Sequence, residues 1–436
     1  MRMIVRGARL HTGRGELAPS PVDVEVGEDG RIARIVPYDD QKEPPATGEL
    51  IEAHGRLLTA PFVEPHIHLD TALTAGEPRW NASGTLWEGI ACWSERKRTL
   101  TREDVVARAT EVLRWQAAQG VLYVRTHCDV TDPGLTALDA LTEVRDRVRD
   151  VMAVQIVAFP QEGIVSFPGG DQLMRAAVAR GADVVGAIPH FEDTREDGVA
   201  SLHLAFSLAE EQGLRVDAHC DEIDDEQSRF VEVLAALALR TGLRGRVTAS
   251  HTTAMGSYNG AYSYKLQRLL RRSGVHLVCN PFANLALQGR FDGYPKRRGL
   301  TQVKEMLGAG VNVAFGHDDV MDPWNPLGTA NPLQTALTGV YAAQLTGADE
   351  IATAFSMVTD RAAEVLGLED YALAPGNWAS FVLLPALSPY DALRRQVRPS
   401  HVVSRGTLLA RTPPSTTHLT WPGEPAAEVD FSRPLL

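Results

Sequence analysis

Apolar, β-branched runs alternate with longer segments of helical periodicity through most of this sequence, between residues 57 and 319. Apolar residues at every second position are typical of strands, and those at every third or fourth position are typical of helices. Eight strand-helix alternations predict an α/β fold, namely a (β/α)8 TIM-type barrel. The eight predicted strands are residues 57–63, 121–127, 151–159, 183–189, 214–219, 246–251, 275–280 and 311–316.

The segment from Thr101 to Gly120 shows the helical pattern. Thr101 and Asp104 resemble a capping box, in which the first side chain accepts a hydrogen bond from a backbone N–H of the first turn. Apolar residues between Val105 and Ala117 share one face, and Gly120 ends the helix. Similar helices are expected at residues 170–181, 197–213, 225–242, 260–274 and 300–310.

Both ends of the chain differ from this pattern. Residues 3–10 and 22–36 are strand-like, and so are residues 379–384 and 401–409. We therefore expect a small β-sandwich domain formed by both termini and a central barrel domain. The tail after Thr412 is rich in proline and is expected to be coil. The predicted limits are residues 1–56 and 375–436 for the small domain and residues 57–374 for the barrel.

Composition excludes several classes of protein. With 436 residues, of which 44% are hydrophobic, the chain can bury a large core. Its net charge of -12 argues against a nucleic-acid partner, because such surfaces are usually basic. The four cysteines form no Cys-x-x-Cys pair, and no apolar run reaches the roughly 18 residues of a membrane span. We expect a cytoplasmic protein with neither a membrane nor a nucleic-acid partner.

Metal-binding residue types recur where predicted strands end. His66 and His68 end the first strand, and because alternate side chains share a face, both imidazoles can point to one divalent metal. His219, His251 and Asp318 end later strands. The carboxyl ends of barrel strands meet at one face, so these groups are expected to converge. His66, His68, His219 and Asp318 are the expected metal ligands.

Glu222 follows His219 by three residues, on the loop that leaves the same strand. Its carboxyl can reach over the metal without binding it, which suits a proton shuttle. A suitable cation lowers the pKa of bound water to about 7, so hydroxide is expected at neutral pH. His251 is either a further ligand or a hydrogen-bond partner of this hydroxide, and Asp318 can take the water proton.

Lysine usage favours one metal rather than two. A second metal would need a carboxylated lysine on a barrel strand to bridge it, and no lysine falls on a predicted strand. One divalent metal is therefore the expected cofactor. The lysines are Lys42, Lys97, Lys265, Lys296 and Lys304.

At these residues the sequence resembles the amidohydrolase superfamily, and within it the bacterial cytosine deaminases. The resemblance implies a single iron(II), replaceable by zinc, as the metal of the four ligands named above. It implies that Glu222 shuttles protons, that His251 orients the hydroxide and that Gln161 grips the amide edge of a pyrimidine. Asp319, Trp324 and Leu86 are implied as pocket residues. The matching stretches are residues 62–70, 157–163, 217–230, 249–255, 316–319 and 322–324.

The resemblance also implies a reaction, the hydrolytic deamination of a free base, with cytosine converted to uracil and ammonia. The enzyme is implied to be a homo-oligomer, typically a hexamer. The pattern departs at Asn325 and around residues 282–286, near the pocket wall, so related cyclic amidines stay open as substrates. These are isocytosine, 5-methylcytosine, isoguanine and creatinine. The rival functions are a ring-amide hydrolase and a metal-free binding scaffold on the same barrel.

Overall fold

The structure is a computed structural model that describes residues 2–43 and 48–432. Eight parallel strands form one sheet in the order β14-β13-β12-β11-β10-β9-β8-β7. A parallel bridge between Ile67 and Asp318 joins the two edge strands, so the sheet closes and the predicted barrel is confirmed. The strands are β7 (Phe62–Ile67), β8 (Val121–Asp129), β9 (Ala153–Phe159), β10 (Val184–Ala187), β11 (Arg215–Cys220), β12 (Val247–His251), β13 (His276–Cys279) and β14 (Val313–Phe315).

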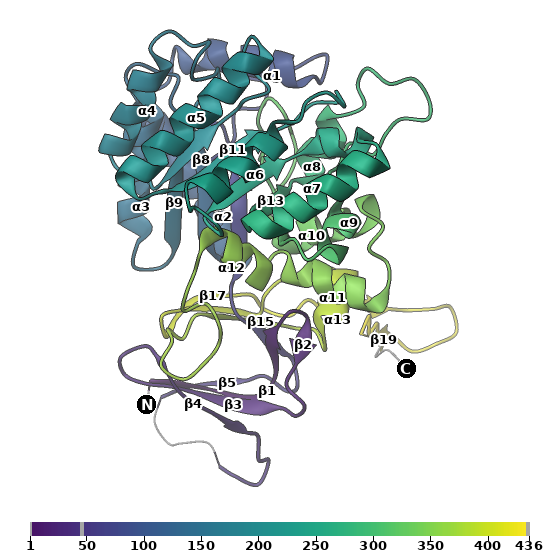
Figure 1. Ribbon diagram of the computed structural model, residues 1–436. Coiled ribbons are helices and arrows are strands. Elements are labelled where there is room, and N and C mark those ends of the chain that lie inside the picture. The colour runs from purple at the N-terminus through teal and green to yellow at the C-terminus, as the bar shows by residue number, and fades with distance from the viewer. Residues whose placement is uncertain (1, 44–47, 433–436) are drawn as a thin grey trace.

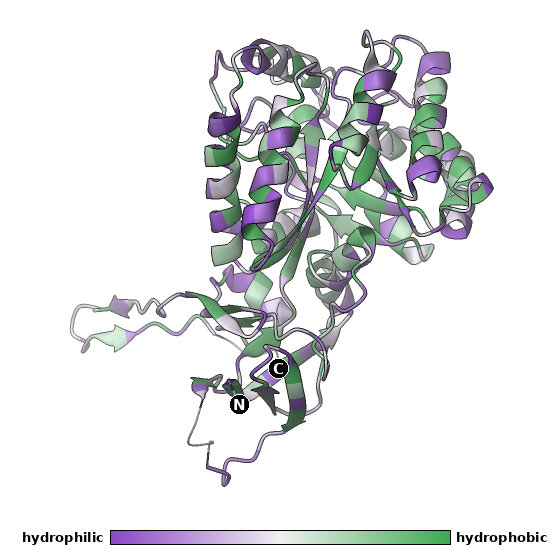
Figure 2. Cartoon of the chain, turned by 90° about the vertical axis from the view of Figure 1, so that its left-hand side faces the viewer, coloured by the Kyte–Doolittle hydropathy of each residue, from purple (hydrophilic) through white to green (hydrophobic). Residues whose placement is uncertain are grey.

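Helices surround this barrel (Figure 1), and Figure 2 shows mostly apolar strands inside and helices with both polar and apolar residues outside. The predicted cap is present, because the Thr101 side chain accepts from the backbone N–H of Asp104. None of the described helices is long and apolar enough to cross a membrane. The helices are α1 (Leu86–Lys97), α2 (Arg102–Ala118), α3 (Thr136–Val148), α4 (Gly170–Ala179), α5 (Arg195–Gln212), α6 (Phe230–Arg240), the 3-10 helix η1 (Thr253–Ser257), α7 (Gly260–Ser273), α8 (Pro281–Leu287), α9 (Val303–Gly308), α10 (Pro332–Ala342), α11 (Ala348–Ser356), α12 (Asp360–Leu366) and α13 (Pro389–Arg395).

A second, nine-stranded sheet takes strands from both ends of the chain, in purple and yellow below the barrel in Figure 1. Its main path is β17-β16-β15-β6-β1-β3-β4, and β2 and β5 both pair with β1. The expected union of the two termini is therefore present. The domain limits stay a prediction, and residues 44–47 and 433–436 lie outside the described residues. The strands are β1 (Met3–Gly13), β2 (Glu16–Leu17), β3 (Val22–Val26), β4 (Ile32–Pro37), β5 (Glu49–Glu52), β6 (Leu57–Thr59), β15 (Phe381–Leu384), β16 (His401–Ser404) and β17 (Thr407–Arg411).

The first predicted barrel strand, residues 57–63, is wrong in its first half. Leu57–Thr59 form β6, which pairs with β1 and β15 in the second sheet, and the barrel strand begins only at Phe62. Pro61 lies between them and has no N–H for a strand ladder, which explains the break. The expected coil after Thr412 also contains two short antiparallel strands, β18 (His418–Leu419) and β19 (Ala427–Glu428).

Candidate active site

Three histidines and one aspartate meet at the carboxyl ends of the barrel strands. His66 lies on β7 and His68 directly after it, His219 lies on β11, and Asp318 follows β14. His66 Nε2 lies 3.2 Å and His68 Nε2 lies 3.4 Å from Asp318 Oδ1. The Nε2 atoms of His68 and His219 are 3.1 Å apart. One ligand atom from each of the four buried side chains lies within 4.8 Å of the others.

This donor set fits a divalent cation. The buried His66 Nε2 has no hydrogen-bond partner. Burial, with the neighbouring His66, lowers the pKa of His219 well below its ordinary value, so its imidazole is neutral and can offer a lone pair. Burial opposes ionisation of Asp318, but His66 and His251 hold its pKa well below the usual range. Neutral imidazoles and one carboxylate are the ligands that zinc and iron(II) accept.

Glu222 and His251 lie beside these ligands. His251 Nδ1 is 3.1 Å from Glu222 Oε1 and 3.8 Å from Asp318 Oδ2. Burial, together with the charge of Asp318, raises the pKa of Glu222 well above its ordinary value. A carboxyl that keeps its proton at neutral pH can donate it to a substrate.

The backbone is strained at two of these positions. His251 has a φ of 69° and Asp318 a φ of 70°, in the left-handed region that residues other than glycine rarely adopt. Such conformations persist where the surrounding structure imposes them, and they cluster at functional sites.

The predicted substrate residues line one small cavity next to the proposed ligands, of about 20 Å³. Thus Leu86 of α1, Gln161 of the loop after β9, and Asp319 and Trp324 of the loop after β14 are brought together with Glu222 and His251. An outer cavity of about 490 Å³ shares Leu86, Glu222 and Leu287 with it. The inner cavity is lined by His68, Leu86, Gln161, His219, Glu222, His251, Leu287, Asp318, Asp319 and Trp324.

Trp324 forms an apolar wall of this cavity because two neighbours fix it. The Asp322 side chain accepts from the backbone N–H of Trp324 at 3.0 Å, and the indole N–H donates to the backbone oxygen of Leu86 at 3.3 Å. A Cβ at Gly89 of α1 would lie 2.3 Å from Trp324 Nε1. Only glycine at position 89 lets α1 pack this closely on the indole.

The sequence assigned no individual role to three residues that lie near the site. Leu287 lines both cavities. The Phe159 ring stacks on the His219 ring, with 3.9 Å between the ring centroids. Asn284 Nδ2 lies 3.0 Å from His251 Nδ1. Phe159 and Leu287 carry no signal apart from being apolar. Asn284 is a buried amide on α8, and the pair Asn280 and Asn284 at helical spacing is the pattern that could have revealed it.

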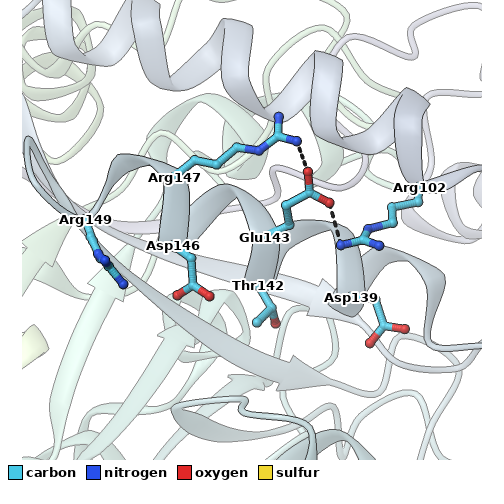
Figure 3. A pocket seen from close by; sticks show the side chains of 7 residues that line it. All are labelled: Arg102, Asp139, Thr142, Glu143, Asp146, Arg147 and Arg149. Carbon is cyan, nitrogen blue, oxygen red and sulfur yellow. Dashed lines mark ion pairs between the residues drawn. The ribbon is translucent and has the colours of Figure 1, made fainter.

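Another cavity, of about 610 Å³, lies away from the site, over α2 and α3 (Figure 3). Its side chains are mostly charged, and Glu143 pairs there with Arg102 and Arg147. No predicted site residue lines it.

Comparison with known proteins defines the class of this chain. The model of the Amidohydrolase family matches residues 49–410, which is most of the sequence. The chain belongs to the amidohydrolase family, as the resemblance implied.

Individual relatives have related activities. The crystal structure of a 5-methylcytosine deaminase from Klebsiella pneumoniae, liganded with 5-fluorocytosine, is 46% identical, with a TM-score of 0.92 over 97% of this chain and 100% of that one. A pterin deaminase from Rhizobium rhizogenes is 29% identical over 90% of this chain and 88% of its own length. An N-isopropylammelide isopropyl amidohydrolase from Pseudomonas sp. is 28% identical over 87% of this chain and 92% of its own length. The chain is a hydrolase that acts on C–N bonds.

Proposed function

We propose that this protein hydrolytically deaminates a free pyrimidine base, with cytosine and 5-methylcytosine as the first candidates and uracil or thymine plus ammonia as products. One observation carries the proposal: Gln161, Glu222 and Trp324 line a single cavity that opens on the cluster of His68, His219 and Asp318. The similarity to a 5-methylcytosine deaminase supports a pyrimidine over other cyclic amidines.

Each residue has a distinct task in this reaction. Gln161 offers one donor and one acceptor to the N1–H and C2 carbonyl of the base, and Trp324 covers the ring with an apolar face. Glu222 donates its proton to the ring nitrogen beside the amino-bearing carbon, so that this carbon becomes electrophilic. The Glu222 carboxylate then takes the hydroxyl proton of the tetrahedral adduct and passes it to the amino group, which leaves as ammonia. The water proton that Asp318 accepted returns to Glu222 and restores its carboxyl.

His66, His68, His219 and Asp318 would hold the metal, with iron(II) favoured and zinc as the alternative. When bound, such a cation supplies a water whose pKa is lowered to about 7 and which is therefore a nucleophile at neutral pH. Asp318 accepts a proton from the attacking water, and His251 orients this water by hydrogen bonding.

Turnover assays test the proposal directly. We expect ammonia from cytosine and 5-methylcytosine, and much less from isocytosine, isoguanine and creatinine. If only one of these three compounds released ammonia, the proposed chemistry would stand and that compound would be the substrate. Ring opening without ammonia would instead identify a ring-amide hydrolase, and absence of metal and turnover would identify a binding scaffold. We also propose a cytoplasmic homo-oligomer, with a hexamer expected by light scattering and no nucleic-acid partner.

A further inference from the structure

Three buried side chains lead from His66 into the barrel interior, away from the substrate cavity. His66 Nδ1 lies 2.9 Å from Ser250 Oγ. Ser250 Oγ in turn lies 2.9 Å from Asp217 Oδ1, and Asp217 Oδ2 lies 2.8 Å from Arg125 Nη1. All four side chains are 0% exposed, and Ser250, Asp217 and Arg125 do not line the cavity. The proposed reaction gives these three residues no task.

Counting donors and acceptors fixes the direction of each hydrogen bond. The guanidinium of Arg125 can only donate, and the carboxylate of Asp217 that it faces can only accept. The single hydroxyl proton of Ser250 must therefore go to Asp217. The Ser250 oxygen is left as an acceptor toward His66, so Nδ1 of the His66 ring carries a proton. The lone pair then lies on Nε2, the atom 3.2 Å from Asp318 Oδ1.

Arg125, at the far end of this series of hydrogen bonds, is held in place. The direction of the hydrogen bonds therefore cannot easily reverse. Arg125 Nη2 donates to the backbone oxygen of Val365 at 3.1 Å and to Gln155 Oε1 at 2.9 Å. Gln155 Nε2 donates to the backbone oxygen of Leu366 at 3.0 Å. These two carbonyls end α12, which packs against the barrel, so the guanidinium keeps its orientation toward Asp217.

We propose that Ser250, Asp217 and Arg125 are positioning residues that hold His66 in the Nδ1–H tautomer, so that Nε2 is offered to a divalent cation. Groups that fix the tautomer of a ligating histidine typically contribute about 10- to 100-fold to metal affinity. The inference rests on the metal site of the proposed function and not on the choice of substrate.

The first test compares two buried hydroxyls of β12 by substitution. Protein freed of metal with a chelator is titrated with zinc(II) in competition with an indicator, and its unfolding midpoint is measured without metal. Ser250→Ala should weaken zinc binding by about 10- to 100-fold. Thr248→Val is the matched control, because Thr248 Oγ1 accepts from Arg125 at 3.3 Å and, among the described residues, has no hydrogen bond with His66. Its zinc affinity should stay within about twofold of the wild type.

Asp217→Asn tests the direction of the hydrogen bonds. The new amide must turn its oxygen to Arg125, so its N–H group donates to Ser250, whose hydroxyl is then free to donate to His66 Nδ1. This moves the ring proton to Nε2, the ligand atom, and should weaken zinc binding more than Ser250→Ala does. Nitrogen-15 chemical shifts of His66 in metal-free protein should show protonated Nδ1 in the wild type.

Each result decides the inference. Unchanged zinc affinity in Ser250→Ala, an equal loss in Thr248→Val, or a wild-type His66 protonated at Nε2 would overturn it while leaving the substrate assignment intact. A wild type that binds no zinc would overturn the metal site and this inference together. A wild type that binds zinc but releases no ammonia would overturn only the proposed substrate.

Discussion

The carboxyl of Glu222 contacts His251, with Oε1 3.1 Å from Nδ1 and both side chains buried. The same Nδ1 lies 3.0 Å from Nδ2 of Asn284, whose Oδ1 accepts from the backbone N–H of Asn280. Because Asn284 thus presents an N–H group, Nδ1 of His251 is an acceptor. Glu222 then contacts it best as a protonated carboxyl, in agreement with its raised pKa. This favours an orienting role for His251 over a role as a fifth ligand.

Glu222→Gln should fold, keep its metal and lose most of its turnover, because the amide preserves the shape but cannot shuttle a proton. General acid-base catalysis is typically worth about 100- to 10,000-fold in rate. Steady-state ammonia release and metal content measure both effects. Glu226→Gln, an exposed acid on the same loop, is the control and should behave like wild type. A drop of less than about tenfold in Glu222→Gln would contradict the shuttle role.

His219→Ala should remove most of the bound metal, because one imidazole of the ligand cluster is lost. Elemental analysis of protein purified without chelator should give one metal per wild-type chain and far less in the variant. His203→Ala, on the exposed side of α5, should retain the metal. Two metals per active chain, or full occupancy in His219→Ala, would show that the ligand set is wrong.

Free cytosine should be deaminated and cytidine should not, because a ribose on N1 removes the hydrogen that Gln161 is proposed to recognise. Gln161→Ala should lose turnover of the base while keeping its metal, since a site built to hydrogen-bond loses its partner. Ammonia release from both compounds, with metal content as the second readout, checks this. Equal rates with cytidine and cytosine would exclude the proposed contact.

Lys97→Met should destabilise the protein. It should also raise KM, because Lys97 is expected to support the loop that carries Gln161. Lys97 Nζ lies 2.8 Å from the buried Asp129 carboxylate and 2.6 Å from that of Glu162, the residue after Gln161. Loss of one partner of a buried ion pair costs about 3 to 5 kcal/mol.

Denaturant unfolding and steady-state kinetics measure these two effects of Lys97→Met. The control is Lys304→Met, which breaks a solvent-exposed pair with Glu350 and should change the free energy of unfolding far less than Lys97→Met does. Similar small losses in both variants would show that the Lys97 cluster does not support the Gln161 loop.

The protein should lose stability as pH falls below neutral, in part through His276. Asn312 Nδ2 lies 3.1 Å from His276 Nδ1, and His276 Nε2 lies 3.3 Å from the Gly245 carbonyl, so the neutral ring satisfies both partners. Burial lowers the pKa of His276 to about 4. Since this lies below the unfolded value of about 6.5, its contribution is complete above pH 6.5 and declines between those two values.

The His276 contribution can be isolated with His276→Gln, which keeps an acceptor and a donor but does not titrate. The free energy of unfolding is measured at about pH 7.5 and at about pH 5. Its decrease between these two pH values should be about 1 to 2 kcal/mol larger in the wild type than in the variant. Equal losses in both proteins would contradict the low folded-state pKa.

Local patterns in the sequence were enough to predict the barrel and to predict that the candidate metal-binding residues meet at one end of it. Strand and helix periodicities are set by neighbours along the chain, and a parallel barrel brings every strand end to one face. For this reason His66, His219 and Asp318 could be expected to meet although more than 250 residues separate the first from the last. The resemblance at short motifs added Gln161 and Trp324, which come from loops without periodicity.

Only the tertiary structure decided contacts between residues with no sequence relationship. The break between β6 and β7 depends on β1 and β15, strands from opposite ends of the chain, which both pair with Leu57–Thr59. The neighbours of His66 are equally non-local, since Ser250, Asp217 and Arg125 come from three other strands. A hydrogen bond forms or fails on differences of a few tenths of an ångström in donor–acceptor distance, and it also depends on which atom holds the proton. Side-chain packing across the barrel sets both.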